Sequence, residues 1–251
     1  MHSPRRDVLY RRWNRVRTNY EMFGLSHTVR LALLHGARVL LAPSETDFDR
    51  TYGTITNDWV EVEEGGLPQT AAADAIRYVP TRPELIQHIC RTLPIRHQEY
   101  TFVDLGSGRG RALLLASHFP FKQIIGIEVS PQHHQISKDN LAIYDAAGRQ
   151  CDAIEAICMD AAEYEFPQSN LVIYMYQPFV GRVFKRVLDH IAELGDRFAV
   201  FVCCSAPWRA NREVLSENRS LHHLKSYLTL SAEQDWLLYS NAKGRHEFET
   251  P

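Results

Sequence analysis

Hydrophobic and polar positions alternate in blocks along the second half of the chain, and the order of the blocks predicts strands that alternate with helices. Short runs rich in Val, Ile, Phe and Tyr, typical of strands buried on both faces, cover residues 100–104, 123–128, 151–159, 170–176 and 198–204. Apolar spacing typical of helices covers residues 109–118, 131–147 and 179–194. This alternation predicts an α/β fold with a mostly parallel sheet and helices on both of its faces.

The end of the chain departs from this alternation. A helix is expected at 207–218, and it is followed by two successive strands, at 221–230 and 235–241, with no clear helix between them. Two strands in succession predict an antiparallel hairpin that closes the sheet. Ser130 before Pro131 predicts a capped helix start, because Ser is a good N-cap and Pro suits the first helical position.

Ahead of the sheet, the pattern predicts two helices within residues 8–41 and a loop at 43–70. Thr81-Arg82-Pro83-Glu84 then predicts a helix start, with Thr81 as the N-cap and Glu84 at the capping-box position. We therefore expect an N-terminal helical extension and capping loop at residues 1–70, and one core domain at 71–251.

Charge is unevenly placed in this chain of 251 residues, although its formal net charge is only -2. Residues 1–42 hold eight arginines against two acids, and residues 45–64 hold seven acids against one arginine. We interpret these two segments as oppositely charged faces that attract each other or water, and this interpretation is favoured over an N-terminal arm that binds nucleic acid. No apolar stretch reaches the roughly 18 residues of a membrane span, so no membrane partner is expected.

The cysteines and histidines give no sign of a metal site. Five cysteines show no CxxC spacing and lie mostly in apolar runs, which predicts reduced core residues of a cytoplasmic protein. Twelve histidines are scattered, and the side chains of the two adjacent pairs diverge in either regular structure. We expect no bound metal.

The candidate chemistry begins at the end of the first expected strand, where Asp104 precedes Gly106, Ser107, Gly108 and Gly110. In an open α/β sheet, ligands bind beyond the carboxyl ends of the strands. Glycine lets the backbone approach a ligand closely and adopt positive φ, and the following helix directs its amide donors toward a polar group. The stretch therefore predicts a binding loop.

Acidic residues at three consecutive strand ends indicate which ligand this loop binds. Glu128 lies 24 positions after Asp104, where an acid accepts hydrogen bonds from both ribose hydroxyls of an adenosine ligand. Asp160 can accept a hydrogen bond from the adenine amino group, and Met159 can lie against the ring. The GxGxG spacing differs from the GxGxxG of dinucleotide sites. The pattern therefore favours an amino-acid-bearing nucleoside whose ammonium group contacts Asp104 and the loop backbone.

These segments resemble the class I S-adenosylmethionine-dependent methyltransferases. "VDLGSGRGR", "GIEVS", "CMDA" and "VIYMYQPF" are similar to their first four motifs, in order and at the expected spacing. The resemblance implies S-adenosylmethionine as the cofactor. It also implies a Rossmann-like, doubly wound sheet of seven strands in the order 3-2-1-4-5-7-6, with the last strand antiparallel.

Closer similarities point to a branch of that family. "DLGSGRGR" together with "YVPTRPELI" resembles the branch of non-SET histone lysine methyltransferases and mitochondrial lysine methyltransferases, in which a Tyr/Pro segment folds over the cofactor. This resemblance implies that Tyr78 and Thr81 bind the cofactor. "FDRTYGT" and "FVDLGSGRGRALLLA" are also similar to a group of uncharacterised bacterial methyltransferases, which implies no substrate.

The fourth motif is where the methyl group would meet its acceptor. Related amino-nitrogen methyltransferases carry Asn-Pro-Pro-Tyr or Asp-Pro-Pro-Tyr there, whereas this chain has Tyr176-Gln177-Pro178-Phe179. Gln177 keeps an amide oxygen on a longer stem, and Phe179 can supply an aromatic wall. Tyr174 and Tyr176 point to the same face of the strand, and Tyr176 is favoured for the active site because it is nearer the strand end. These four residues are the predicted catalytic segment.

The acceptor itself is less constrained by the sequence. A protein side-chain nitrogen is favoured over RNA or a small molecule. Tyr52, Asp58, Glu63 and Glu64 lie in the loop that is expected to fold over the mouth of the site. If the acceptor is a lysine in a basic peptide, this acidic loop would attract it. An NAD-dependent oxidoreductase is disfavoured by the glycine spacing. A non-catalytic S-adenosylmethionine-binding protein is disfavoured because the fourth motif is retained.

Overall fold

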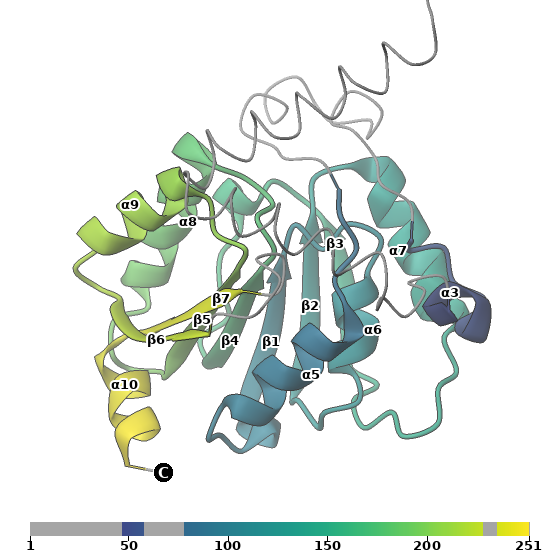
Figure 1. Ribbon diagram of the computed structural model, residues 1–251, viewed down its shortest axis with the longest axis horizontal. Helices are drawn as coiled ribbons and strands as arrows, with labels where there is room; N and C mark the ends of the chain where they lie inside the picture. The colour runs from purple at the N-terminus through teal and green to yellow at the C-terminus, as the bar shows by residue number, and fades with distance from the viewer. Residues whose placement is uncertain (1–46, 58–77, 228–234, 251) are drawn as a thin grey trace, which may run out of the picture.

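A seven-stranded sheet runs through the computed structural model, which describes residues 47–57, 78–227 and 235–250 (Figure 1). The strand order is β3-β2-β1-β4-β5-β7-β6. The strands are β1 (Tyr100–Leu105), β2 (Gln123–Glu128), β3 (Ile154–Cys158), β4 (Asn170–Met175), β5 (Val200–Ser205), β6 (His222–Tyr227) and β7 (Trp236–Ser240). The first five pair in parallel, and β7 is antiparallel to both β5 and β6. The predicted fold class and strand order are therefore confirmed.

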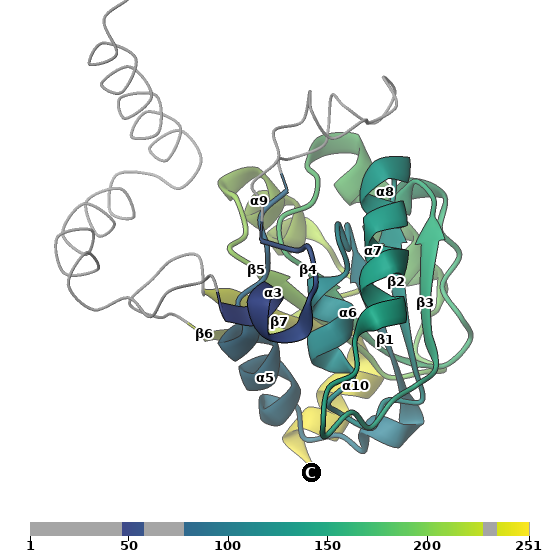
Figure 2. The same cartoon turned by 90° about the vertical axis from the view of Figure 1, so that its right-hand side faces the viewer.

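Helices cover both faces of the sheet (Figures 1 and 2). They are α3 (Asp47–Tyr52), α5 (Pro83–Thr92), α6 (Arg111–Ala116), α7 (Pro131–Ile143), α8 (Gly181–Glu193), α9 (Arg209–Glu217) and α10 (Ala242–Glu249), with short 3-10 turns η2 (His97–Glu99) and η3 (Ala161–Glu163). In Figure 1, α5, α6 and α10 lie on the near face, and α8 and α9 lie on the opposite one.

Alternate residues of the central strands supply two cores. Phe102 of β1 and Tyr174 of β4 face α5 and α6, while Val103 and Ile173 face α8. All six residues of β1 are buried, as expected for a central parallel strand with helices on both sides. This packing fixes the carboxyl ends of β1, β2 and β4 at one edge, and the candidate site lies there.

The capping box predicted at Thr81 and Glu84 is wrong. Helix α5 begins at Pro83, its N-cap residue is Arg82, and no side chain caps it. The Thr81 hydroxyl instead shares a 3.2 Å hydrogen bond with the Tyr174 hydroxyl, which lies 93 positions away in the sequence. A buried partner from the sheet therefore takes the place of the local cap. The cap predicted at Ser130 is confirmed, since its side chain accepts a hydrogen bond from the His133 amide.

Two helices were not predicted. Helix α3 falls in a segment expected to be loop, and it forms where Phe48 and Tyr52 pack against Tyr144. Helix α10 follows β7, and the Asn241 side chain caps it by accepting a hydrogen bond from the Gly244 amide. The sequences of α3 and α10 are short and have little apolar periodicity. Tertiary packing and capping therefore stabilise these two helices, and the sequence pattern does not reveal them.

Of the five cysteines, four are buried as expected, but Cys158 is exposed at the end of β3. The helices expected within residues 8–41, the domain boundary at 70/71 and the loop acids Asp58, Glu63 and Glu64 lie outside the described residues. Within the described ranges, no helix has the length and apolarity needed to cross a membrane.

Candidate active site

The glycine loop after β1 is held between two segments that are distant in the sequence. Gly106 and Gly108 have φ angles of 76° and 53°, in the left-handed region that favours glycine. A Cβ added at Gly106 would lie 2.1 Å from Cβ of Pro178, and one added at Gly108 would lie 2.2 Å from the Tyr78 ring. The loop therefore needs glycine both for its backbone conformation and for these close contacts. It also brings the predicted cofactor loop against the predicted catalytic segment.

Glu128 is fixed by backbone amides at the end of β2. Its Oε2 atom accepts a 2.7 Å hydrogen bond from the Gly108 amide, and its Oε1 atom accepts a 2.8 Å hydrogen bond from the Ser130 amide. Burial raises the pKa of this carboxyl group, and the amide hydrogen bonds partly offset the rise. Each carboxylate oxygen has a second lone pair, so Glu128 can still accept the two hydroxyl groups of a ribose.

Asp104 is 3% exposed in β1. Burial, and then the nearby charge of Glu128, raise the pKa of Asp104 well above its ordinary value. Two buried carboxyl groups that disfavour each other's ionisation are stabilised by a cation placed between or beside them. The ammonium group of an amino-acid-bearing nucleoside supplies such a cation, so the residues present fit the predicted cofactor.

Met159 and Asp160 lie at the neighbouring strand end, as the sequence predicts. The Met159 amide donates a 3.0 Å hydrogen bond to the Glu128 carbonyl, and 39% of the Met159 residue is exposed. Asp160 is half-buried, and its Oδ1 atom accepts a 2.9 Å hydrogen bond from the Ala162 amide at the start of η3. An exposed thioether beside a fixed carboxylate can contact the face and the amino edge of an adenine ring.

Gln177 has the most unusual environment in the predicted catalytic segment. Its φ is 51°, which is rare for a residue other than glycine, and only 8% of the residue is exposed. Neither amide atom of its side chain has a hydrogen-bond partner within the described ranges. A buried, unpartnered amide on a strained backbone costs stability, and such combinations cluster at functional sites.

The aromatic residues around Gln177 have different surroundings. Tyr176 is half-buried and packs against the core that faces α5, on the same face as the fully buried Tyr174. Phe179 is buried in the opposite core, where its ring lies 6.3 Å from that of Phe184. The Phe179 carbonyl accepts a 3.0 Å hydrogen bond from Nδ2 of Asn211 in α9. The structure thus brings Tyr176, Gln177 and Pro178 to the glycine loop and turns the Phe179 ring into the core.

A network behind the glycine loop was not predicted. Arg111, 4% exposed, donates from Nε to the Thr56 hydroxyl at 2.6 Å. The Thr56 hydroxyl and amide in turn donate to Asp49 at 2.6 and 2.7 Å. Burial opposes ionisation of Asp49, but these hydrogen bonds, one from Thr54 and the charge of Arg111 outweigh it and lower its pKa. The network ties α3 to the first turn of α6.

Two further contacts extend this network to the predicted cofactor residues. The Tyr78 hydroxyl donates a 2.8 Å hydrogen bond to the Thr56 carbonyl, which holds the Tyr78 ring on Gly108. Asn140 of α7 bonds both the amide and the carbonyl of Ile55, and it also donates to the Arg109 carbonyl. Residues 55 and 56 therefore buttress the loop. The resemblance of "FDRTYGT" to bacterial methyltransferases was the one sequence signal for this segment.

Arg109 and His133 flank the Tyr78 ring. The Arg109 guanidinium carbon is 5.7 Å from the ring centre, and the His133 ring centre is 5.2 Å from it. Burial, and then the charge of Arg109, lower the pKa of His133 to about 4. His133 is therefore neutral at physiological pH. Tyr52, expected over the mouth of the site, packs instead against Phe48 and Tyr144.

No group of three His, Cys, Asp or Glu residues able to hold a metal occurs within residues 47–57, 78–227 and 235–250. The polar groups at the carboxyl ends of β1, β2 and β4 are the carboxylates and amides described above. This donor set matches a nucleoside cofactor.

Comparison with known proteins supports the same cofactor class. The model of a family described as histone methylation protein DOT1 matches residues 59–166, which is less than half of the chain and ends before Gln177. No curated protein matches the sequence significantly.

Solved structures were compared as well. An RNA methyltransferase from Salinibacter ruber in complex with S-adenosyl-L-homocysteine is 15% identical, has a TM-score of 0.45, and aligns over 64% of this chain and 92% of that one. A precorrin-6y C5,15-methyltransferase from Geobacter metallireducens is 14% identical, with a TM-score of 0.46 over 65% and 89% of the two chains. The glycopeptide N-methyltransferase MtfA, complexed with S-adenosylmethionine, is 12% identical, with a TM-score of 0.47 over 63% and 92%.

These likenesses are too distant to add to the argument, which rests on the family match, the strand order and the geometry of the edge. The GxGxG loop, the acid that its amide contacts and the proline packed on its first glycine all lie at the carboxyl ends of β1, β2 and β4. The family match, the strand order and the residues at this edge support an S-adenosylmethionine-dependent methyltransferase with the class I fold and with S-adenosylmethionine as its cofactor.

Proposed function

We propose that the chain transfers a methyl group to a nitrogen atom of a protein side chain, and that Gln177 positions this nitrogen. The observation that carries the proposal is the buried side-chain amide of Gln177, which has no hydrogen-bond partner in the described part of the chain. An amide oxygen can accept a hydrogen bond from an amine or amide N–H group, and the donation orients the nitrogen lone pair. The positive φ of Gln177 supports a functional role, because strained backbone conformations cluster at functional sites.

S-adenosylmethionine supplies an activated methyl group on a sulfonium, so the chain needs no further activating group for the methyl donor. Glu128, Asp104 and Met159 would hold the cofactor at the ends of β1, β2 and β3. Pro178 packs on Gly106, so the cofactor loop and the acceptor segment are fixed with respect to each other. Holding two reactants close and in line can supply several kcal/mol of the barrier reduction, on the order of 7 to 11 kcal/mol in favourable cases.

The choice of a protein acceptor is supported by the matched family, whose description names histone methylation. In this proposal the acceptor nitrogen attacks the methyl carbon, the carbon–sulfur bond breaks, and the nitrogen releases its proton to water. The half-buried Tyr176, next to Gln177, would form one wall beside the acceptor.

The proposal is tested with S-adenosylmethionine that carries a tritiated methyl group. The purified chain is incubated with cell extract, and the label is followed after separate digestion with protease and with ribonuclease. Label that protease releases and ribonuclease leaves in place supports the proposal, whereas the reverse result overturns it.

Variants then connect the activity to Gln177. We expect Gln177→Ala to bind S-adenosylmethionine normally and to lose methyl transfer, because the cofactor contacts come from other residues. Gln87→Ala is the matched control, since Gln87 is an exposed glutamine of α5. Full activity in Gln177→Ala would contradict the positioning role of Gln177.

A further inference from the structure

The charges of α8 are placed against the helix dipole. Arg182, Lys185 and Arg186 lie in the first half of the helix, and Asp189 and Glu193 lie in the second half. The amino end of a helix carries partial positive charge and favours acids, whereas the carboxyl end favours bases. The charge order of α8 is the opposite at both ends, so interaction with the helix dipole does not account for it.

The three cations of α8 also lie on one face. Their spacing of three and four residues makes them neighbours on the helix surface, where like charges repel. All three are exposed, and none makes an ion pair or hydrogen bond in the structure that is described. The three cations repel one another, and no ion pair or hydrogen bond within the described ranges offsets this repulsion.

Helix α9 repeats the pattern. It begins with Arg209, has Arg212 in its first turn, and places Glu213 and Glu217 toward its end. No acid occurs in the first turn of either α8 or α9. The two helices pack against each other on one face of the sheet (Figure 1).

Both helices begin at the edge that holds the candidate active site. Helix α8 starts four residues after Gln177, and α9 follows the end of β5, the strand next to β4. A contact joins the two helix starts, because Asn211 of α9 donates to the Phe179 carbonyl just before α8. The amino ends of both helices therefore lie at the edge of the sheet where Gln177 follows β4.

We propose that the first two turns of α8 and the first turn of α9 form a docking surface for an acidic segment of the acceptor protein. We call this surface the basic edge and define it by Arg182, Lys185, Arg186 and Arg212. The inference rests on the proposed function and names the sequence context of its acceptor: the nitrogen to be methylated lies next to Asp and Glu residues. Charge complementarity of this kind raises the association rate and fixes the register of the bound segment.

An acidic protein segment fits the basic edge better than a nucleic acid does. Proteins that bind single-stranded nucleic acid stack bases on exposed aromatic side chains. In residues 47–57, 78–227 and 235–250, every Phe, Tyr and Trp residue is buried or half-buried, and none is fully open for a base to stack on. The three α8 cations span little more than one helical turn, which suits two or three carboxylates and is short for a phosphate backbone.

Fluorescence anisotropy with defined probes tests the inference. The probes are a labelled ten-residue peptide with one lysine among Glu and Asp, the same peptide with Ser in place of the acids, and a labelled oligouridylate of ten nucleotides. Each is titrated with the full chain saturated with S-adenosylhomocysteine. We expect the acidic peptide to bind and the Ser peptide to bind about tenfold more weakly or not at all, with weaker binding at high salt.

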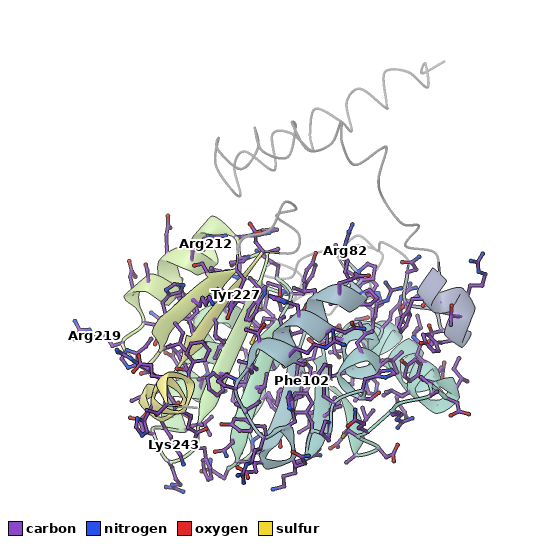
Figure 3. All side chains as sticks on the ribbon, turned by 60° about the horizontal axis from the view of Figure 1, so that its bottom comes forward. Arg82, Phe102, Arg212, Arg219, Tyr227 and Lys243 are labelled. Carbon is purple, nitrogen blue, oxygen red and sulfur yellow. The ribbon has the colours of Figure 1, made fainter. Side chains whose placement is uncertain are left out.

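Two triple variants with the same net charge separate docking from general attraction. Arg182→Gln/Lys185→Gln/Arg186→Gln should lower the affinity for the acidic peptide about tenfold. Arg91→Gln/Lys122→Gln/Lys243→Gln removes two exposed cations and the half-buried Lys243 elsewhere, and it should leave the affinity unchanged. In Figure 3, Arg212 is labelled near the top of the ribbon and Lys243 near its bottom.

Equal losses in the two triple variants, or no binding of the acidic peptide, would overturn the inference. Binding of the oligouridylate alone would also overturn it and would replace the acidic segment with a nucleic acid. The tritium experiment is independent of these results. If extract protein is labelled while the acidic peptide does not bind, the basic edge fails and the proposed function stands.

Discussion

The Cβ atom of Pro178 lies 2.1 Å from the position that a Cβ atom would occupy on Gly106. No side chain can be accommodated there without moving either the cofactor loop or the acceptor segment. The contact joins the predicted cofactor loop to the predicted catalytic segment, since Gly106 follows β1 directly and Pro178 follows Gln177.

Gly106→Ala should therefore lower both stability and cofactor affinity. Alanine at a positive φ costs roughly 1–2 kcal/mol, and displacement of Pro178 adds to that cost. Calorimetric titration with S-adenosylmethionine and urea unfolding measure the two effects. Gly195→Ala is the matched control, because Gly195 has a φ of 58° and no atom within 4 Å of its added Cβ. A Gly106→Ala variant that behaves like Gly195→Ala would show that the contact with Pro178 has no role.

The places of the proposed cofactor residues in the fold could be predicted from the sequence because they depend on where the strands end. Parallel strands buried on both faces give continuous apolar runs, and the acids Asp104, Glu128 and Asp160 stand where these runs stop. The parallel register then places the strand ends at one edge. This part of the site follows from local pattern and from one general property of α/β sheets.

The network around Arg111 could not be predicted in the same way. It joins Asp49 and Thr56 to a helix more than 50 positions later, and no periodicity connects them. The role of Thr81 was missed for a related reason. Its sequence context satisfies a capping pattern, but the hydroxyl of Tyr174 is the partner that it finds in the folded chain. Tertiary packing determines whether such a side chain forms a hydrogen bond to a neighbour in the sequence or to a distant residue.

Thr56→Val should weaken the anchor of the Tyr78 ring. The substitution removes the hydroxyl that accepts from Arg111 and donates to Asp49, and it leaves a buried guanidinium with fewer partners. We expect a loss of about 1.5–3 kcal/mol in the free energy of unfolding, since both partners are charged. Affinity for S-adenosylmethionine should fall as well. Thr56→Ser restores the hydroxyl and should recover most of both losses, whereas equal losses in the two variants would contradict the network.

Glu128→Gln should weaken cofactor binding with little change in shape. The substitution replaces one carboxylate oxygen with an NH2 group, which cannot accept from the amide of either Gly108 or Ser130. The charge that favours hydrogen bonds from ribose hydroxyls is also lost. Charge-assisted hydrogen bonds contribute about 1.5–3 kcal/mol, so the dissociation constant measured by calorimetry should rise roughly 10- to 100-fold. An unchanged constant would exclude Glu128 from the cofactor site.

His133 should make the free energy of unfolding depend on pH between 7 and 5. Its folded pKa, about 4, lies below the ordinary value of 6.5, so the unfolded chain binds the proton more tightly. Stability from this group is present above pH 6.5 and is lost as the pH falls toward 4. The loss between pH 7 and 5 is about 2 kcal/mol by linkage. Urea unfolding of wild type and His133→Asn measures it, and an equally steep dependence in the variant would assign the effect to other groups.

Gln177→Gly should make the chain more stable and less active. Glycine adopts the φ of 51° without strain and removes the buried amide that has no partner in the described structure. Relief of the strain is worth roughly 1–2 kcal/mol, partly offset by the greater entropy of glycine in the unfolded chain.

Ala206→Gly is the comparison for stability, because Ala206 has a φ of 46° and no side-chain amide. Both variants should unfold at a higher temperature, and methyl transfer to the labelled protein fraction should be lost only in Gln177→Gly. A Gln177→Gly variant that is both less stable and inactive would indicate that the amide stabilises the fold. That result would remove the argument that its strain is retained for the acceptor.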